Sequence, residues 1–181
     1  MGQSNSYRTQ SRESEPNGLL RVREAAKKDK KAQFTALLHH VTIEQLRISY
    51  QSLQRQAAPG VDGMTWKEYG CDLEGRLQDL HERVQRGAYQ AQPSRRVLIP
   101  KSDGRQRPLG VAALEDKILQ HAVGTVLNQI WEEDFLGFSY GFRPGRSQHD
   151  ALDALYVGVT RKKVSWILDL DIRAFLDPVS Y

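Results

Sequence analysis

The sequence predicts an α+β fold that is rich in helix. Apolar residues recur every three or four positions over several long stretches, which is typical of amphipathic helices. Two extended runs flank the Ser-Asp-Gly turn at 102–104, which indicates a hairpin. Apolar and polar residues alternate in the closing stretch 164–172, as they do in a strand. A chain of 181 residues can hold one domain, or one domain and a fragment of another.

Composition excludes several kinds of protein. The single cysteine, Cys71, excludes an internal disulfide and a cysteine-based metal site. No run of 18 apolar residues and no secretory signal is present, so we expect a cytoplasmic protein without a membrane partner. The net charge of +4 is compatible with a nucleic-acid partner.

The first 32 residues are polar and mixed in charge, with a basic run at 25–31. This composition predicts a disordered, basic leader over 1–32 that passes into the start of a solvated helix. The alternative is an electrostatic arm that contacts RNA phosphates.

Two helices are predicted in the first half of the chain. Thr42 and Gln45 match a capping box and begin a helix over about 43–56. Thr65 and Glu68 match a second box, and the apolar stripe that follows predicts one helix over about 66–86.

The segment 95–111 reads RRVLIPKSDGRQRPLGV and predicts an exposed basic hairpin. Pro100 and Pro108 favour an exposed ribbon over a central strand. Such a ribbon could close on a phosphate chain, or its charges could simply protect an edge from aggregation. The basic residues are Arg95, Arg96, Lys101, Arg105 and Arg107.

A buried helix is predicted over 114–134 and another helix over 148–161, capped by Ser147 with Asp150. The loop between them, 135–147, is dense in aromatic residues and contains Arg143 and Arg146. Aromatic rings beside arginines suit stacking on bases, although a tightly packed loop would have the same composition.

The closing strand over 164–172 carries Asp169 and Asp171 on one face. A carboxylate at the end of a buried strand can hold Mg²⁺, which prefers oxygen ligands. The alternative is that these residues are solvated and cap the strand.

Five segments of the chain resemble, in order, those of the reverse transcriptases that bacterial group II introns encode. They are APGVDGMTW (58–66), RRVLIPKSDGRQRPLGV (95–111), LEDKILQHAV (114–123), FLGFSYGFRPGRSQHDAL (135–152) and LDLDIRAFLD (168–177).

The resemblance implies a right-hand polymerase, with the N-terminal extension and fingers over 33–160 and the start of a truncated palm over 161–181. Asp171 matches a catalytic aspartate, and the backbone carbonyl of Ile172 would be a second ligand of a two-Mg²⁺ site. The partners implied are intron RNA as template, a DNA primer and deoxynucleoside triphosphates. Lys101 and Arg107 match positions that clamp the triphosphate, and the positions matching template or phosphate contacts are Arg95, Arg96, Arg143 and Arg146. Asp169 and Asp177 would be mainly structural.

Two departures from the family pattern matter. Leu176 stands where the family usually has a phenylalanine against the nucleotide sugar, so selection against ribonucleotides would be looser. The family's second aspartate box falls beyond Tyr181, so we expect this polypeptide alone to be inactive and its unpaired palm strand to be disordered or to self-associate. The alternatives are a non-catalytic RNA-binding module and a degenerate remnant of such a protein.

Overall fold

The computed structural model describes residues 17–100, 104–162 and 164–172 of the chain. The described residues divide into two compact units, one before and one after the boundary between residues 135 and 136. The hydrophobic core formed by the described residues lies in the first unit, and α6 (Gln148–Arg161) lies in the second. The mixture of several helices with one small sheet agrees with the predicted helix-rich α+β class.

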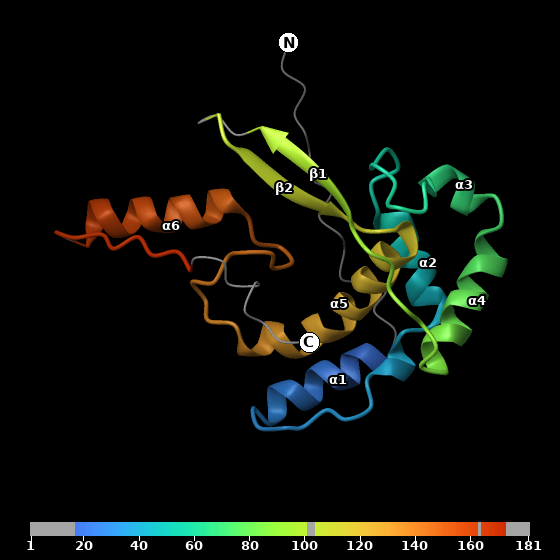
Figure 1. Cartoon of the computed structure of the whole chain (residues 1–181). Coiled ribbons are helices and arrows are strands. Elements are labelled where there is room, and N and C mark those ends of the chain that lie inside the picture. The colour runs from blue at the N-terminus through green and yellow to red at the C-terminus, as the bar shows by residue number, and fades with distance from the viewer. Residues whose placement is uncertain (1–16, 101–103, 163, 173–181) are drawn as a thin grey trace, which may run out of the picture. The chain divides into compact units, whose positions relative to one another are not determined.

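Helix α5 (Leu114–Asp134) is the central element of the first unit (Figure 1), and its bounds match the prediction. Its buried stripe repeats every four residues and consists of Leu114, Ile118, Ala122 and Val126. Against this stripe pack two helices, α1 (Asn17–Lys28) and α2 (Ile43–Ser52). Trp131, in the last two turns of this predicted buried helix, falls outside the stripe and is half exposed.

Helix α1 overturns the prediction of a disordered leader for residues 17–28. Its residues Leu19, Val22 and Ala26 are spaced by three and four and are buried. Arg23 forms an ion pair with Glu133 at the other end of α5. A charged composition hid this short apolar face, which becomes stable only because α5 covers it. Residues 1–16 lie outside the described residues.

The predicted helix over 66–86 is in fact two helices, α3 (Trp66–Gly70) and α4 (Leu73–Gln85). The chain leaves helical geometry at Asp72, whose φ and ψ are −135° and 57°. Gly70 and Asp72 both favour a break over a helix interior. Helix α2 also ends earlier than predicted, because Leu53 adopts an extended conformation. A short 3₁₀ turn, η1 (Leu38–His40), precedes α2.

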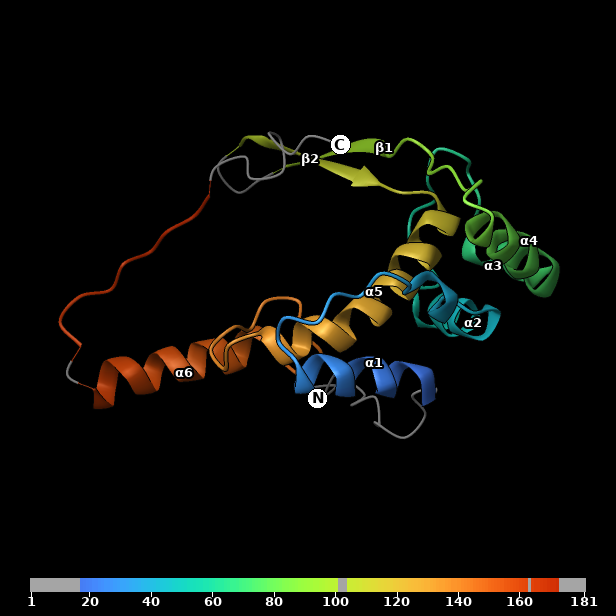
Figure 2. The ribbon, with the colours of Figure 1, turned by 90° about the horizontal axis from the view of Figure 1, so that it is seen from below.

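Strands β1 (Arg95–Pro100) and β2 (Gln106–Val111) form the predicted antiparallel hairpin. Figure 2 shows it as a two-stranded ribbon that links α4 to the start of α5. Val111 is half-buried, and all the other residues of both strands are exposed. The hairpin therefore gains little from packing, and its two ends join it to the helices.

The second unit contains α6, whose predicted capping box is present. The Ser147 hydroxyl accepts a hydrogen bond from the Asp150 backbone N–H, and the Asp150 carboxylate accepts one from the Ser147 N–H. The prediction of a strand over 164–172 is wrong, because these residues have no regular secondary structure. A strand needs a partner for its backbone groups, and alternating side chains cannot supply one.

Among the described helices, none has both the length and the apolar character that crossing a bilayer requires.

Candidate functional site

The hairpin separates its arginines between two faces. Arg95 lies opposite Val111, and Arg107 lies opposite Ile99. Directly opposed residues of an antiparallel pair point to the same face, and so do residues two apart on one strand. Arg95 and Arg107 therefore share one face, roughly 13 Å apart along the strands. Arg96 lies on the other face, opposite Gly110.

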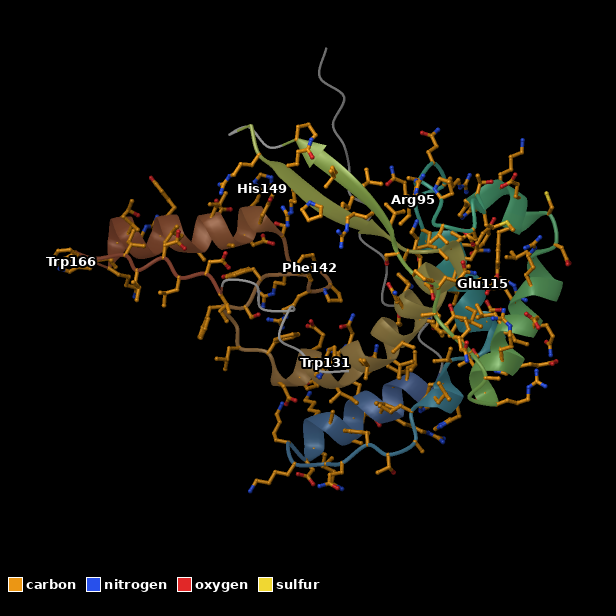
Figure 3. The ribbon with its side chains drawn as sticks, in the orientation of Figure 1. Arg95, Glu115, Trp131, Phe142, His149 and Trp166 are labelled. Carbon is orange, nitrogen blue, oxygen red and sulfur yellow. The ribbon has the colours of Figure 1, made fainter. Side chains whose placement is uncertain are left out.

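The shared face is both basic and apolar. Its remaining residues are Val97, Ile99, Leu109 and Val111, and the first three are exposed. Within the part of the chain that the structure describes, Arg95, Arg96 and Arg107 form no ion pair. Figure 3 shows Arg95 at the base of the hairpin. Lys101, at the turn, lies outside the described residues. The described arginines thus keep their charge available for an anionic ligand.

The loop between α5 and α6 uses its two predicted RNA-binding arginines differently. Arg143 is half-buried and donates hydrogen bonds to the carbonyls of Leu136 and Ser139, at 2.9 and 2.8 Å. Arg146 is exposed and lies over the ring of Tyr140, 5.6 Å from its centroid. Arg143 therefore holds the loop together, whereas the guanidinium of Arg146 faces solvent on one side.

Phe142 is the most unusual residue of this loop. Its side chain is fully exposed (Figure 3), and its backbone φ is 55°, in the left-handed region that non-glycine residues seldom adopt. An exposed aromatic ring in strained backbone gains nothing from packing in this unit. Its chemistry suits stacking on a base or a partner side chain.

The closing segment holds the predicted catalytic residue. Asp171 and Ile172 are described and exposed, as is Asp169. Carboxylate and carbonyl oxygens suit Mg²⁺. Among the described residues, however, no three His, Cys, Asp or Glu side chains come together as a metal site would require. Leu176 and Asp177 lie outside the described residues.

A buried polar cluster that the sequence reasoning missed lies at the start of α5. Asp116 is 3% exposed and accepts hydrogen bonds from the Tyr89 hydroxyl at 2.5 Å and from the Gln92 backbone N–H at 3.2 Å. Glu115 accepts two hydrogen bonds from Arg83, at 2.9 and 3.0 Å. The signal in the sequence was the position of Asp116 two residues before Ile118, within the apolar period of the helix.

Tyr69 and Tyr89, the two tyrosines that contact these carboxylates, are held in their neutral form. Burial, followed by the nearby carboxylates, raises the pKa of Tyr69 and of Tyr89 above the usual range. The Tyr69 hydroxyl donates to Glu115 at 3.2 Å. Both hydroxyls therefore remain donors at neutral pH, and the cluster is suited to holding structure and not to acid–base chemistry.

Comparisons with known proteins connect these features to a family. The sequence model of the family described as "Reverse transcriptase (RNA-dependent DNA polymerase)" matches residues 99–181, which include β2 and Asp171. Protein YkfC of Escherichia coli K12 is 40% identical over 126 residues, covering 68% of this chain and 33% of that protein. The group II intron-encoded protein LtrA of Lactococcus lactis is 31% identical over 137 residues, covering 74% of this chain and 22% of that protein.

An intron protein of a eukaryote also matches. The uncharacterized 91 kDa protein in the cob intron of Schizosaccharomyces pombe is 39% identical over 89 residues, covering 49% of this chain and 11% of that protein. The chain thus spans no more than 33% of the length of these three relatives. The family description names reverse transcriptases, and the name of LtrA says that a group II intron encodes it. The chain belongs to the reverse transcriptases of the kind that group II introns encode.

Proposed function

We propose that this chain is part of an RNA-directed DNA polymerase that copies intron RNA from a DNA primer and assists intron splicing. The observation that carries the proposal is the family match over 99–181, which spans β2 and Asp171. In this proposal Lys101 and Arg107 bind the triphosphate, and Leu176 contacts its sugar. Asp171 is the catalytic carboxylate.

The basic hairpin is the nucleic-acid contact that the described residues support best. Its shared face offers Arg95 and Arg107 to phosphates, and the exposed apolar side chains between them can lie against bases or sugars. Arg96 would contact RNA from the opposite face. Arg146 and the exposed ring of Phe142 would add contacts from the second unit, and Arg143 would support that loop.

RNA affinity measured against salt concentration tests the binding half of the proposal. Arg107→Ala should weaken binding and reduce the slope of log affinity against log salt by about one counterion. Arg96→Ala, which removes the contact proposed for the opposite face, is the comparison variant and should reduce both the affinity and the slope less. If the unmodified chain does not bind RNA at low salt, the binding half is wrong, and the alternative of a non-catalytic RNA-binding module falls with it.

Magnesium would be held by the Asp171 carboxylate and the Ile172 carbonyl, with further ligands that the described residues do not supply. Bound there, Mg²⁺ would offset the negative charge of a triphosphate. We therefore propose that this polypeptide alone does not polymerise. Template-dependent incorporation of deoxynucleotides by the purified chain, abolished by Asp171→Ala, would contradict this.

We also propose that two copies of the chain associate. Because residues 164–172 form no strand, the surface better suited to this is the exposed stripe of α6, which comprises Leu152, Leu155, Tyr156 and Val159. Acidic residues lie near the start of α6 and basic residues near its end, so an antiparallel pair would bring opposite charges together. Sedimentation equilibrium should show a weak dimer that Leu155→Asp abolishes. A monomer at all concentrations would refute this.

A further inference from the structure

The hairpin needs a support that its own residues do not provide. All of β1 is exposed, and in β2 the first five residues are exposed and the last is half-buried. Two-stranded ribbons have little independent stability or fixed direction in water. The proposed function nevertheless requires Arg95 and Arg107 to meet a ligand in a defined orientation, so the orientation has to be set where the hairpin joins the helices.

One carboxylate holds the segment that leads into β1. The two oxygens of Asp116 receive separate hydrogen bonds, Oδ1 from the Tyr89 hydroxyl and Oδ2 from the backbone N–H of Gln92. These partners lie six and three residues before Arg95, where β1 begins. Asp116 is in the first turn of α5, where the helix dipole favours a negative charge. A buried carboxylate with both oxygens engaged is a rigid attachment point.

The strand that leaves the hairpin is attached at the same place. After Val111 the chain passes through Ala112 to Ala113, which is buried and precedes α5. Gly60 lies so close that a Cβ at that position would be 2.5 Å from the Cα of Ala113. Lys117 donates a hydrogen bond to the carbonyl of Ala58 at 2.9 Å and thereby holds the same loop against α5. The chain that leaves the hairpin thus runs directly into the helix whose Asp116 holds the chain that enters it.

We propose that Asp116 is a positioning residue that sets the direction of the basic hairpin, and through it the orientation of Arg95 and Arg107 toward an anionic strand or triphosphate. The effect of Asp116 on ligand binding rests on the proposed function, whereas its effect on the direction of the hairpin does not. The adjacent Glu115, labelled in Figure 3, does something different, because its partners Arg83 and Tyr69 belong to α4 and α3. Glu115 thus holds α3 and α4, and it reaches the segment before β1 only indirectly, through Arg83, which lies 5.5 Å from the ring centroid of Tyr89. Asp116 contacts that segment directly.

The neighbouring carboxylates allow a matched experiment. In a Cys71→Ser background, Leu98→Cys places a spin label on an exposed β1 position. Asp116→Asn removes the negative charge and leaves one acceptor oxygen for the two donors Tyr89 and Gln92, so the label should become at least twofold more mobile in electron paramagnetic resonance spectra. Glu115→Gln should leave the mobility of the label unchanged, even where it lowers thermal stability to a similar extent.

Two outcomes would overturn the inference: an unchanged label mobility in folded Asp116→Asn, or an equal increase in Glu115→Gln. If Asp116→Asn does not fold, Tyr89→Phe decides the question, because it removes only the hydrogen bond at Oδ1 and should give a smaller rise in mobility. No rise in that variant would also overturn the inference.

RNA affinity provides the second measurement and separates the two proposals. Asp116→Asn should bind RNA about three- to tenfold more weakly than the parent and Glu115→Gln nearly as well, because a less ordered hairpin loses more entropy on binding. If the label becomes mobile in Asp116→Asn but RNA affinity is unchanged in both Asp116→Asn and Arg107→Ala, then Asp116 does position the hairpin. In that case the hairpin is not the RNA contact. Unchanged affinity in Asp116→Asn alone would reject its role in orienting the arginines.

Discussion

Gly60 is the residue at which the loop before α3 meets the start of α5. It is buried, and the space that a side chain would need is filled by the backbone of Ala112 and Ala113. Backbone atoms cannot move aside as the end of a flexible side chain can. The absence of a side chain at Gly60 is therefore what lets this loop approach the helix.

Gly60→Ala should lower the free energy of unfolding by about 1–3 kcal/mol, because the added methyl group overpacks the junction. The matched control is Gly124→Ala in the middle of α5, where a Cβ meets nothing within 4 Å. In that variant the free energy of unfolding should rise by about 0.5–1 kcal/mol, because alanine favours a helix more than glycine does. Urea unfolding of both variants measures the difference, and equal effects would show that the close approach is absent in solution.

The ion pair between Arg23 and Glu133 makes the attachment of α1 depend on pH. The hydrogen bond from Arg23, at 2.8 Å, lowers the pKa of Glu133 below its usual value. A carboxylate whose pKa is lower in the folded state contributes its stability above its unfolded pKa of about 4.3 and loses that contribution as the pH falls through the folded pKa.

Between about pH 5 and pH 3, the unmodified chain should therefore lose more stability than Glu133→Gln. The difference should be below about 1 kcal/mol, because solvent screens a pair near the surface. Urea unfolding across this pH range measures it, and added salt should shrink it. Parallel pH profiles for the two proteins would contradict the prediction.

Helix α1 shows how an element with a charged composition can still belong to the core. Leu19 is 2% exposed, whereas the next residue, Leu20, is 42% exposed. The two leucines differ only in which side of the helix they occupy. Adjacent positions on a helix point about 100° apart, so one leucine faces α5 and the other faces solvent.

Leu19→Ala should lower the free energy of unfolding by about 2–4 kcal/mol, because it leaves a cavity against the core. Leu20→Ala should change it by less than about 1 kcal/mol. Thermal or urea unfolding followed by circular dichroism compares the two directly. Similar losses in both variants would mean that α1 does not pack on α5 as described.

At the scale of the whole molecule, stability is concentrated in the first unit. The buried hydrophobic residues among those described belong to it, whereas α6 buries no side chain. Local opening is easiest where few apolar contacts have to be broken. The two units should therefore differ in how often they open.

Native-state hydrogen exchange should show this difference. Amides between Ile118 and Val126 in α5 should exchange only through global unfolding, and those of α6 should exchange at least a hundredfold faster. Ser147→Ala, which removes the capping hydroxyl of α6, should speed exchange in α6 and leave α5 unchanged. Equal protection in both helices would contradict the division of stability between the units.

Local sequence by itself determined the elements whose signals are complete within a short stretch. The caps at Thr65 and Ser147, the hairpin around its glycine turn and the whole of α5 follow from neighbouring residues. The order of the five segments also determined the family. The roles predicted for Asp171, Lys101 and the arginines remain predictions, because they concern ligands that a single chain does not contain.

Tertiary structure alone decided the features that depend on a distant partner. Residues 164–172 have the alternation of a strand, but no strand of the described residues pairs with them, and they are irregular. Residues 17–28 look solvated and become a packed helix because α5 covers Leu19 and its neighbours. Asp116 looks like a surface charge and is buried, because Tyr89 and Gln92 arrive from a separate segment to occupy both of its oxygens. The periodicity of apolar residues predicts which face of a helix or strand a residue occupies. Only the tertiary fold determines which residues pack against that face.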